Sequence, residues 1–137
     1  MVPVTINYWA VLVATIAAMA IGALWYSPLL FAKQWMKEVG KGAGDMNQTG
    51  PVYALTAVTT FMTAYILAHF VAYAVGSGSS SAGAGALTGL WAWLGFVVPM
   101  IGSEHLFSGK TKNLYLITVG HYLLSLVVMG AILGAWV

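Results

Sequence analysis

The sequence predicts an all-α membrane protein with four transmembrane helices and one short interfacial helix. Three observations predict this fold class: 61% of the 137 residues are hydrophobic, only 6% are charged, and four apolar runs are long enough to cross a bilayer. A soluble domain carries about 25% charged residues, so this chain has too few charges to cover a soluble surface. We therefore expect a single membrane domain over residues 1–137, with the lipid bilayer as its solvent.

The four apolar runs are expected to span the membrane at residues 4–26, 51–75, 82–103 and 113–136. A bilayer core of about 30 Å requires roughly 20 apolar residues in a helix, and each run meets that length. Pro99 lies inside the third run, where its missing backbone hydrogen bond can kink the helix. The polar residues 104–112 are expected to form the turn before the fourth span.

The short interfacial helix is expected at residues 28–39, directly after the first span. Ser27 suits the cap of this helix and Pro28 its first turn. The following residues separate into an apolar and a polar face at helical spacing, which is typical of a helix that lies in the membrane surface. The apolar face holds Leu29, Ala32, Trp35, Met36 and Val39, and the polar face holds Lys33, Gln34, Lys37 and Glu38.

The lysines indicate how the chain is oriented. Lys33, Lys37 and Lys41 lie between the first and second spans, and Lys110 and Lys112 lie between the third and fourth. The two terminal segments and the glycine-serine linker at residues 76–81 carry no lysine. Because cytoplasmic connections are enriched in lysine and arginine, we expect these two connections in the cytoplasm and both termini outside.

Small residues recur at four-residue spacing in the spans, which lets helix backbones approach closely in lipid. Spacing alone leaves two partners open: another helix of the same bundle, which we favour, or a helix of a second copy in a homo-oligomer. The residues with this spacing are Ala14, Ala18 and Gly22 in the first span, Ala64, Ala68 and Ala72 in the second, Gly85 and Gly89 in the third, and Gly130 and Gly134 in the fourth. In the second span they belong to a longer stripe that begins with Thr56 and Thr60.

A candidate polar site lies in the lysine-bearing half of the fourth span. His121 shares a helix face with Thr118 and Ser125. Ionisable groups at membrane depth are costly, so they suggest a function by default. Two interpretations remain open for this face: a hydrogen bond between helices, or a neutral imidazole that lines a polar cavity.

Glu104 is the second part of this candidate site. One interpretation is a solvated residue of the turn, paired with Lys110, Lys112 or Asn113. The other is that Glu104 reaches into the bundle toward His121. At helical rise the two residues differ in depth by roughly 12 Å, so direct contact requires the third helix to end later than residue 103.

A secondary candidate lies in the second span, where Tyr65, His69 and Tyr73 follow one another at four-residue spacing. This stripe is either a polar edge that hydrogen-bonds to another helix near the outer interface, or a proton-linked or ligand site. The second interpretation uses the ordinary imidazole pKa, which lies close to neutrality.

Other function classes find no support in the sequence. The chain has no cysteine, and its five basic residues are all lysines. A net charge of +2 is too small to favour nucleic acid as a partner. We find no phosphate-binding glycine loop, no helical His-Glu-x-x-His and no serine elbow, and we expect no metal and no cofactor.

Two groups of residues are similar to the bacterial domain-of-unknown-function 1761 family. The first runs from Gly22 to Phe31 and includes Trp25-Tyr26-Ser27-Pro28, with Trp35 following. The second comprises Gly95-Phe96, Pro99, Glu104, Leu106-Phe107, the run from Asn113 to Ile117, Gly120, Tyr122 and the run from Met129 to Gly134. This resemblance implies a compact four-span protein of the bacterial inner membrane, without an established activity. Glu104 belongs to the shared pattern, whereas His121 stands where a tyrosine is expected in many relatives.

Three functions are consistent with these observations. The first is a small transporter or channel-like protein, a homo-oligomer whose path is lined by Glu104, His121, Thr118 and Ser125. The second is a structural subunit that binds another membrane protein and has no flux of its own. A membrane enzyme that acts on a lipid or quinone ranks last, because the sequence offers neither a nucleophile nor a metal set.

Overall fold

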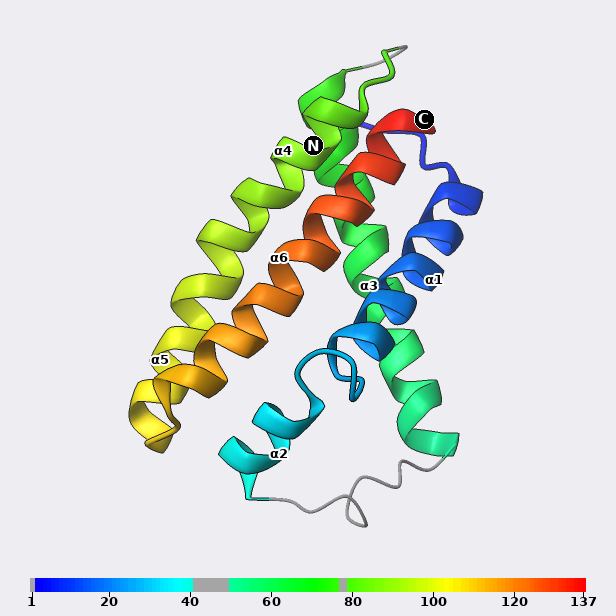
Figure 1. The fold of residues 1–137 in the computed structure, drawn as a ribbon. Helices are drawn as coiled ribbons and strands as arrows, with labels where there is room; N and C mark the ends of the chain where they lie inside the picture. Colours follow the sequence, from blue (N-terminus) through cyan, green and yellow to red (C-terminus); the bar gives the residue numbers. More distant parts are fainter. Residues whose placement is uncertain (1, 41–49, 77–78) are drawn as a thin grey trace.

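The computed structural model describes residues 2–40, 50–76 and 79–137, and all regular structure in these residues is helical (Figure 1). The helices are α1 (Tyr8–Trp25), α2 (Ala32–Val39), α3 (Gly50–Val75), α4 (Ala82–Ala92), the π-helical turn η2 (Trp93–Val97), α5 (Val98–Ser108) and α6 (Lys112–Ala135). Four helical stretches are long and apolar enough to cross a membrane, with α4, η2 and α5 forming one of them. The predicted fold class, with a short helix between the first and second spans, is confirmed.

Two predicted helix starts were too early. The first helix begins at Tyr8 rather than at residue 4, because the Asn7 side chain caps it by accepting hydrogen bonds from the backbone N–H groups of Trp9 and Ala10. The interfacial helix begins at Ala32 rather than at residue 28. The preceding residues form tight turns instead, in which the carbonyl of Ser27 accepts the N–H groups of both Leu30 and Ala32.

The third span is longer than predicted, and the expectation of a turn over residues 104–112 was wrong for its first half. The helix continues through Glu104 to Ser108 and ends at Gly109, whose φ of 70° is left-handed. Glycine adopts this conformation without a steric penalty, so it is a common helix stop. Nothing between Glu104 and Ser108 breaks a helix, which explains why the polar character of these residues was a poor guide to the boundary.

Pro99 is accommodated by a π turn rather than by a break in the helix. A proline has no N–H to donate to the preceding turn. In η2 the backbone N–H of Val98 reaches the carbonyl of Trp93, five residues back, and α5 follows directly with Pro99 in its first turn. The phenol of Tyr115 on α6 also donates to the carbonyl of Val98 at 2.9 Å. The local change of hydrogen bonding therefore keeps the span continuous.

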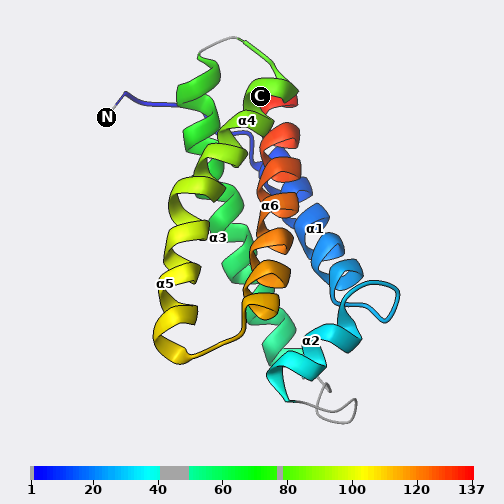
Figure 2. The same ribbon diagram turned by 60° about the vertical axis from the view of Figure 1, so that its left-hand side comes forward.

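Helices α4 and α6 lie side by side with their backbones in contact (Figures 1 and 2). A Cβ atom on Gly85 would lie 2.0 Å from the carbonyl oxygen of Gly130, and one on Gly89 would lie 2.1 Å from the carbonyl oxygen of Leu126. A Cβ on Gly134 would lie 2.3 Å from the carbonyl oxygen of Ser81. These glycines thus pack two helices of one bundle against each other.

The core lies where α1, α3 and α6 meet. Ala14 and Ala18 of α1 pack there with Ala64 and Ala68 of α3, and all four are buried. Ala72 is half-buried one turn further along α3. The core also contains Ala10, Val11, Leu67, Val71, Leu126, Met129 and Leu133.

Helix α3 is supported mainly along its second half. Its buried residues all lie between Ala64 and Val71, whereas residues 50–59 are exposed except for half-buried Ala57. In Figure 1 the beginning of α3 diverges from α6 toward the bottom of the view. A cavity lined by residues of α3 and α6 lies beside this divergence.

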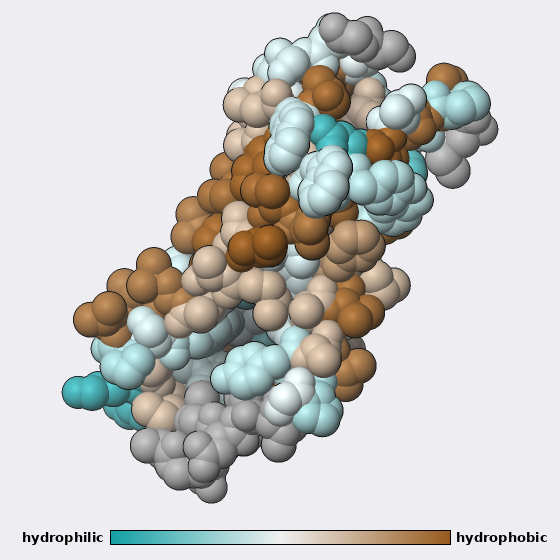
Figure 3. Space-filling view, turned by 90° about the vertical axis from the view of Figure 1, so that its right-hand side faces the viewer, coloured by the Kyte–Doolittle hydropathy of each residue, from teal (hydrophilic) through white to brown (hydrophobic). Residues whose placement is uncertain are grey.

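The lysines that the structure describes gather at one end of the bundle. We call this the lysine end: it holds Lys33, Lys37, Lys110 and Lys112 near the end of α1, the start of α3 and the turn between α5 and α6. Lys41 lies outside the described residues. The start of α1 and the end of α6 lie at the opposite, terminal end (Figure 1). Figure 3 shows hydrophobic residues across the middle of one face and the strongest hydrophilic colour toward its ends, as expected for a bilayer-spanning surface.

Candidate functional site

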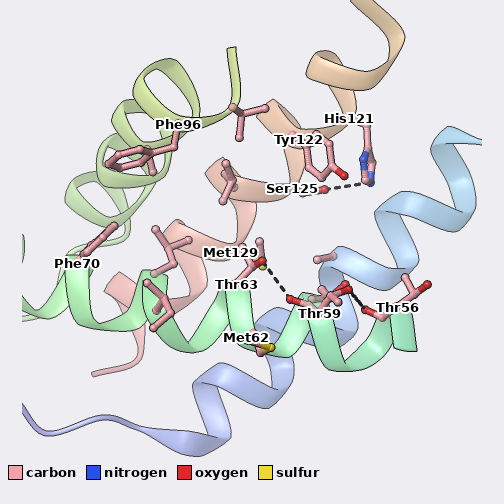
Figure 4. A pocket seen from close by; sticks show the side chains of 17 residues that line it. Thr56, Thr59, Met62, Thr63, Phe70, Phe96, His121, Tyr122, Ser125 and Met129 are labelled. Atoms are coloured by element: carbon pink, nitrogen blue, oxygen red, sulfur yellow. Dashed lines mark hydrogen bonds between the residues drawn. The ribbon is translucent and has the colours of Figure 1, made fainter. Parts of the chain in front are cut away.

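A cavity of about 570 Å³ lies between α3, η2 and α6, near the middle of each span. Figure 4 shows its two polar walls, with threonines on α3 facing His121, Tyr122 and Ser125 on α6. The remaining lining is apolar apart from methionine sulfur, and one residue, Ala18, comes from α1. The residues lining the cavity are Ala18, Thr56, Thr59, Thr60, Met62, Thr63, Ile66, Leu67, Phe70, Ala92, Phe96, Val97, His121, Tyr122, Ser125, Leu126 and Met129.

The first polar wall is a row of four threonines on α3. Each hydroxyl donates to a backbone carbonyl of its own helix: Thr56 to Val52 at 2.8 Å, Thr59 to Thr56 at 3.0 Å, Thr60 to Thr56 at 2.7 Å and Thr63 to Thr59 at 3.1 Å. A hydroxyl has one hydrogen and two lone pairs. Because the hydrogens are used within the helix, this wall presents mainly hydrogen-bond acceptors.

The second polar wall is formed by α6. The hydroxyl oxygen of Ser125 lies 3.4 Å from Nε2 of His121, and Ser125 itself is buried. Next to them in the sequence, Tyr122 places its ring 5.0 Å from the imidazole, measured between centroids. This wall therefore presents a serine–histidine pair beside a phenol, with Ser125 buried, His121 half-buried and Tyr122 exposed (Figure 4).

The position of His121 depends on a small residue of α1. A Cβ atom on Gly22 would lie 3.3 Å from Nε2 of His121, which is tighter than most contacts of this kind. The imidazole centroid also lies 5.2 Å from that of Tyr26 and 6.5 Å from that of Trp25. Gly22 thus leaves room for His121 to lie against the end of α1.

Among the described side chains that line the cavity, none carries a permanent charge. Phe70 of α3 and Phe96 of η2 border it with ring centroids 6.4 Å apart. Met62, Ile66 and Phe96 remain exposed on the outer surface of the same helices. A molecule in this cavity would therefore touch hydroxyls and an imidazole on two sides, and apolar groups elsewhere.

The predicted partners of His121 lie in different places. Glu104 is exposed and pairs with Lys110, its Oε1 lying 2.8 Å from Nζ. Its other oxygen lies 2.9 Å from Nδ1 of buried His105, although the geometry there makes no hydrogen bond. The helix does continue past residue 103, but Glu104 does not line the cavity that His121 lines. Of the predicted set, the structure brings together His121 and Ser125.

Thr118 and Asn113, the other predicted residues of α6, make hydrogen bonds away from His121. The Thr118 hydroxyl donates to the carbonyl of Leu114 within α6, at 2.9 Å. The Asn113 amide donates to Oε1 of Glu38 on α2, at 3.3 Å. Asn113 therefore belongs to the contact between α2 and α6, at the lysine end.

The secondary candidate lies outside the cavity, in the half of α3 near the terminal end. Nδ1 of His69 lies 2.9 Å from the carbonyl oxygen of Tyr65, and because a carbonyl only accepts, this nitrogen is the donor. The His69 ring meets Tyr65 edge-on at 4.7 Å, and the Tyr73 phenol donates to the carbonyl of Val2 at 2.9 Å. The Tyr73 contact joins α3 to the start of the chain, whereas the His69 contacts lie within α3.

Sequence reasoning missed most of the α3 wall. The spacing of small residues assigned Thr56 and Thr60 to helix packing, and no sequence pattern assigned a role to Thr59 or Thr63. The spacing of these four hydroxyls, at intervals of three and four residues in an otherwise apolar span, was the available signal. The described residues contain no group of three or more His, Asp or Glu side chains placed to hold a metal ion.

The four long apolar helices and the cavity within their span define a small polytopic integral membrane protein. Residues 9–134 match the family model described as "Protein of unknown function (DUF1761)". The match covers nearly the whole chain, so the protein belongs to this family, as its sequence pattern indicated. The chain matches no curated protein and no solved structure.

Proposed function

We propose that this protein is a small transporter for a neutral, lipid-soluble molecule that carries a hydrogen-bond donor. The observation that supports this function is the cavity of about 570 Å³ that α3 lines from Thr56 to Phe70. It lies in the middle of the spans and combines two polar walls with apolar surroundings. Such a mixture is typical of sites that hold small organic molecules.

The lining favours this ligand class. A charged ligand would leave water for a cavity whose described lining offers no opposite charge, which is costly. The four threonine oxygens can accept hydrogen bonds, and each such bond contributes about 0.5–1.5 kcal/mol. Phe70, Phe96 and Ile66 offer contacts for an apolar body. A long-chain alcohol or a phenol meets both requirements.

The packing suggests which part of the bundle moves during transport. Backbone contacts at Gly85 and Gly89 hold α4 firmly against α6. By contrast, residues 50–59 of α3 have little support from the other helices. Transport requires two conformations that differ in access to the site. In this proposal α3 closes toward α6 and opens again, while α4 and α6 remain one unit.

Distances between spin labels test this motion, and the absence of native cysteines makes the labelling specific. Tyr53→Cys on α3 and Leu116→Cys on α6 report the diverging pair, because both side chains are more than half exposed. Leu87→Cys on α4 and Leu124→Cys on α6 form the control pair across the glycine contact. We expect two distances for the first pair, in proportions that change when 1-dodecanol is added, and one distance for the control. A single, unchanging distance for the first pair would contradict the proposal.

One observation favours a second candidate function. In this function the protein is a subunit that binds another membrane protein or a second copy of itself. Thr56, Thr59 and Thr63 are exposed on the surface of α3, where small polar side chains suit contacts between membrane helices. Native mass spectrometry in a mild detergent separates the two functions. A reproducible bound small molecule favours the transporter, and a discrete oligomer without one favours the binding subunit.

A further inference from the structure

A second cavity lies at the lysine end and is separate from the first. Its volume is about 490 Å³, and it lies between α2 and the first half of α6. The two cavities share no lining residue. The residues lining the second are Trp25, Phe31, Gln34, Lys37, Glu38, Asn113, Leu116, Ile117 and Gly120.

The floor of this cavity is apolar and firmly held. The Trp25 indole donates to the carbonyl of Ile117 on α6 at 3.0 Å, and its ring lies 4.7 Å from that of Phe31, measured between centroids. A Cβ on Gly120 would lie 3.0 Å from Cζ2 of Trp25, so this glycine permits the indole to approach α6. Leu116 adds an apolar side chain to the floor, and Gly120 is the lining residue of α6 nearest to the middle of the span.

The rim of the cavity carries one group of each charge. Thr111 and Asn113 donate hydrogen bonds to the carboxylate of Glu38, which fixes its position and lowers its pKa. Glu38 is therefore ionised at neutral pH. Lys37 precedes it on α2 and lines the same cavity, and within the described residues it has no carboxylate at ion-pair distance. Gln34, one turn earlier, adds an amide.

The level of this cavity in the bundle indicates the kind of ligand. It lies where α1 ends at Trp25 and α6 begins near Asn113, beside the amphipathic helix α2. Spans end at the lipid headgroup region, where tryptophan is also enriched. The apolar floor runs from this level toward the middle of the span. A lipid fits this arrangement, with its headgroup at the rim and the start of its acyl chains on the floor.

We propose that this cavity binds a phospholipid with a zwitterionic phosphoethanolamine headgroup. The phosphate accepts hydrogen bonds from the Lys37 ammonium and the Gln34 amide. The ethanolamine ammonium donates to the Glu38 carboxylate. An anionic headgroup without an amine would instead place negative charge beside Glu38 and offer that carboxylate no cationic partner, so the paired charges select for the zwitterion.

Native mass spectrometry tests this selection directly. The purified protein is mixed with equal amounts of phosphatidylethanolamine and phosphatidylglycerol that have the same acyl chains. We expect the wild-type protein to retain mainly phosphatidylethanolamine. Equal retention of the two lipids, or a preference for phosphatidylglycerol, would overturn the proposal.

Three variants assign the selection to this cavity. Lys37→Gln is expected to lower retention of phosphatidylethanolamine on the order of fivefold, because one ion pair near a surface contributes up to about that factor. Lys33→Gln is the matched control, since Lys33 lies on the same helix but does not line the cavity. Glu38→Gln is expected to remove the preference between the two lipids.

The controls separate loss of the site from loss of the fold. Far-ultraviolet circular dichroism establishes that each variant keeps the helical content of the wild type. An equal loss of phosphatidylethanolamine in the Lys33→Gln and Lys37→Gln variants would contradict the assignment, as would an unchanged lipid preference in Glu38→Gln. The inference is independent of the transport proposal, because it concerns a different cavity and a different measurement.

Discussion

Replacing Gly89 by alanine adds one methyl group where α4 and α6 touch backbone to backbone. The new Cβ would lie 2.1 Å from the carbonyl oxygen of Leu126 and 2.7 Å from its carbonyl carbon. Ordinary van der Waals contact begins at 3.4 Å, so the helices must separate locally by about 1.3 Å, the difference between 3.4 and 2.1 Å. The atoms in the way are backbone atoms, which cannot rotate aside as a flexible side chain can.

This separation is expected to cost about 1–3 kcal/mol, the usual penalty for overpacking a well-packed interior. Gly95→Ala is the matched control, because Gly95 belongs to the same span and a Cβ there meets nothing within 4 Å. Both variants replace a helical glycine, so both gain the higher helix propensity of alanine. We therefore predict that Gly89→Ala unfolds with a free energy about 1–3 kcal/mol lower than Gly95→Ala.

Reversible unfolding in mixed micelles with increasing sodium dodecyl sulfate, followed by circular dichroism, measures this difference. Equal unfolding free energies for the two alanine variants would refute the close contact between α4 and α6. Such a result would also remove the reason for treating these two helices as one unit during transport.

Three further predictions concern the contacts of α6. Trp93→Phe removes an indole that donates to the carbonyl of Val119 at 2.8 Å, and should lower the unfolding free energy by about 0.5–1.5 kcal/mol in the same assay; no loss would contradict the contact. Gly22→Leu should displace His121, whose Nε2 would lie 3.3 Å from an added Cβ, and shift the imidazole resonances in nuclear magnetic resonance spectra; unchanged resonances would place His121 elsewhere. Hydrogen bonds from Thr111 and Asn113 lower the pKa of Glu38 in the folded protein below its ordinary value of 4.5. The ionised carboxylate should therefore stabilise the contact between α2 and α6 fully at pH values above 4.5, and this stabilisation should be lost as the pH falls through the pKa of the folded state. Hydrogen exchange in α2, corrected for intrinsic rates, should accelerate over that acidic range in the wild type and not in Glu38→Gln; equal pH dependence in both would contradict the assignment.

The sequence was a good guide to the spans because length and apolar character are what a bilayer requires. It was a poorer guide to the end of the third span, since polarity at Glu104 did not reveal that the helix stops only at Gly109. The four-residue spacing of the glycines predicted close packing between helices, but it did not say which helices would meet. That choice depends on the arrangement of the whole bundle.

The candidate site was harder to predict than the fold. His121 and Ser125 share a helix face, so their proximity follows from a spacing of four residues. The opposite wall comes from α3, and its distance from α6 depends on where α3 diverges from the bundle. Glu104 was attractive because it is ionisable, yet Lys110 lies closer and pairs with it at the surface. Local patterns identify helix faces, whereas tertiary packing decides which faces enclose a cavity.

In the proposed function, the cavity of about 570 Å³ between α3, η2 and α6 accepts a neutral molecule through the hydrogen-bond donor of that molecule. The test compares 1-dodecanol with methyl undecyl ether, which has a chain of equal length but lacks the donor. Each compound is added to the protein in lipid nanodiscs, and its effect on the thermal stability of the protein is measured. The same comparison is made for a Thr59→Val, Thr63→Val double variant, which removes two of the acceptor oxygens on α3. We predict that the alcohol stabilises the wild-type protein more than the ether does. The difference should correspond to roughly twofold to tenfold tighter binding of the alcohol, which is the contribution of one hydrogen bond. The double variant should lose most of this difference. Equal effects of the alcohol and the ether on the wild-type protein would contradict the claim.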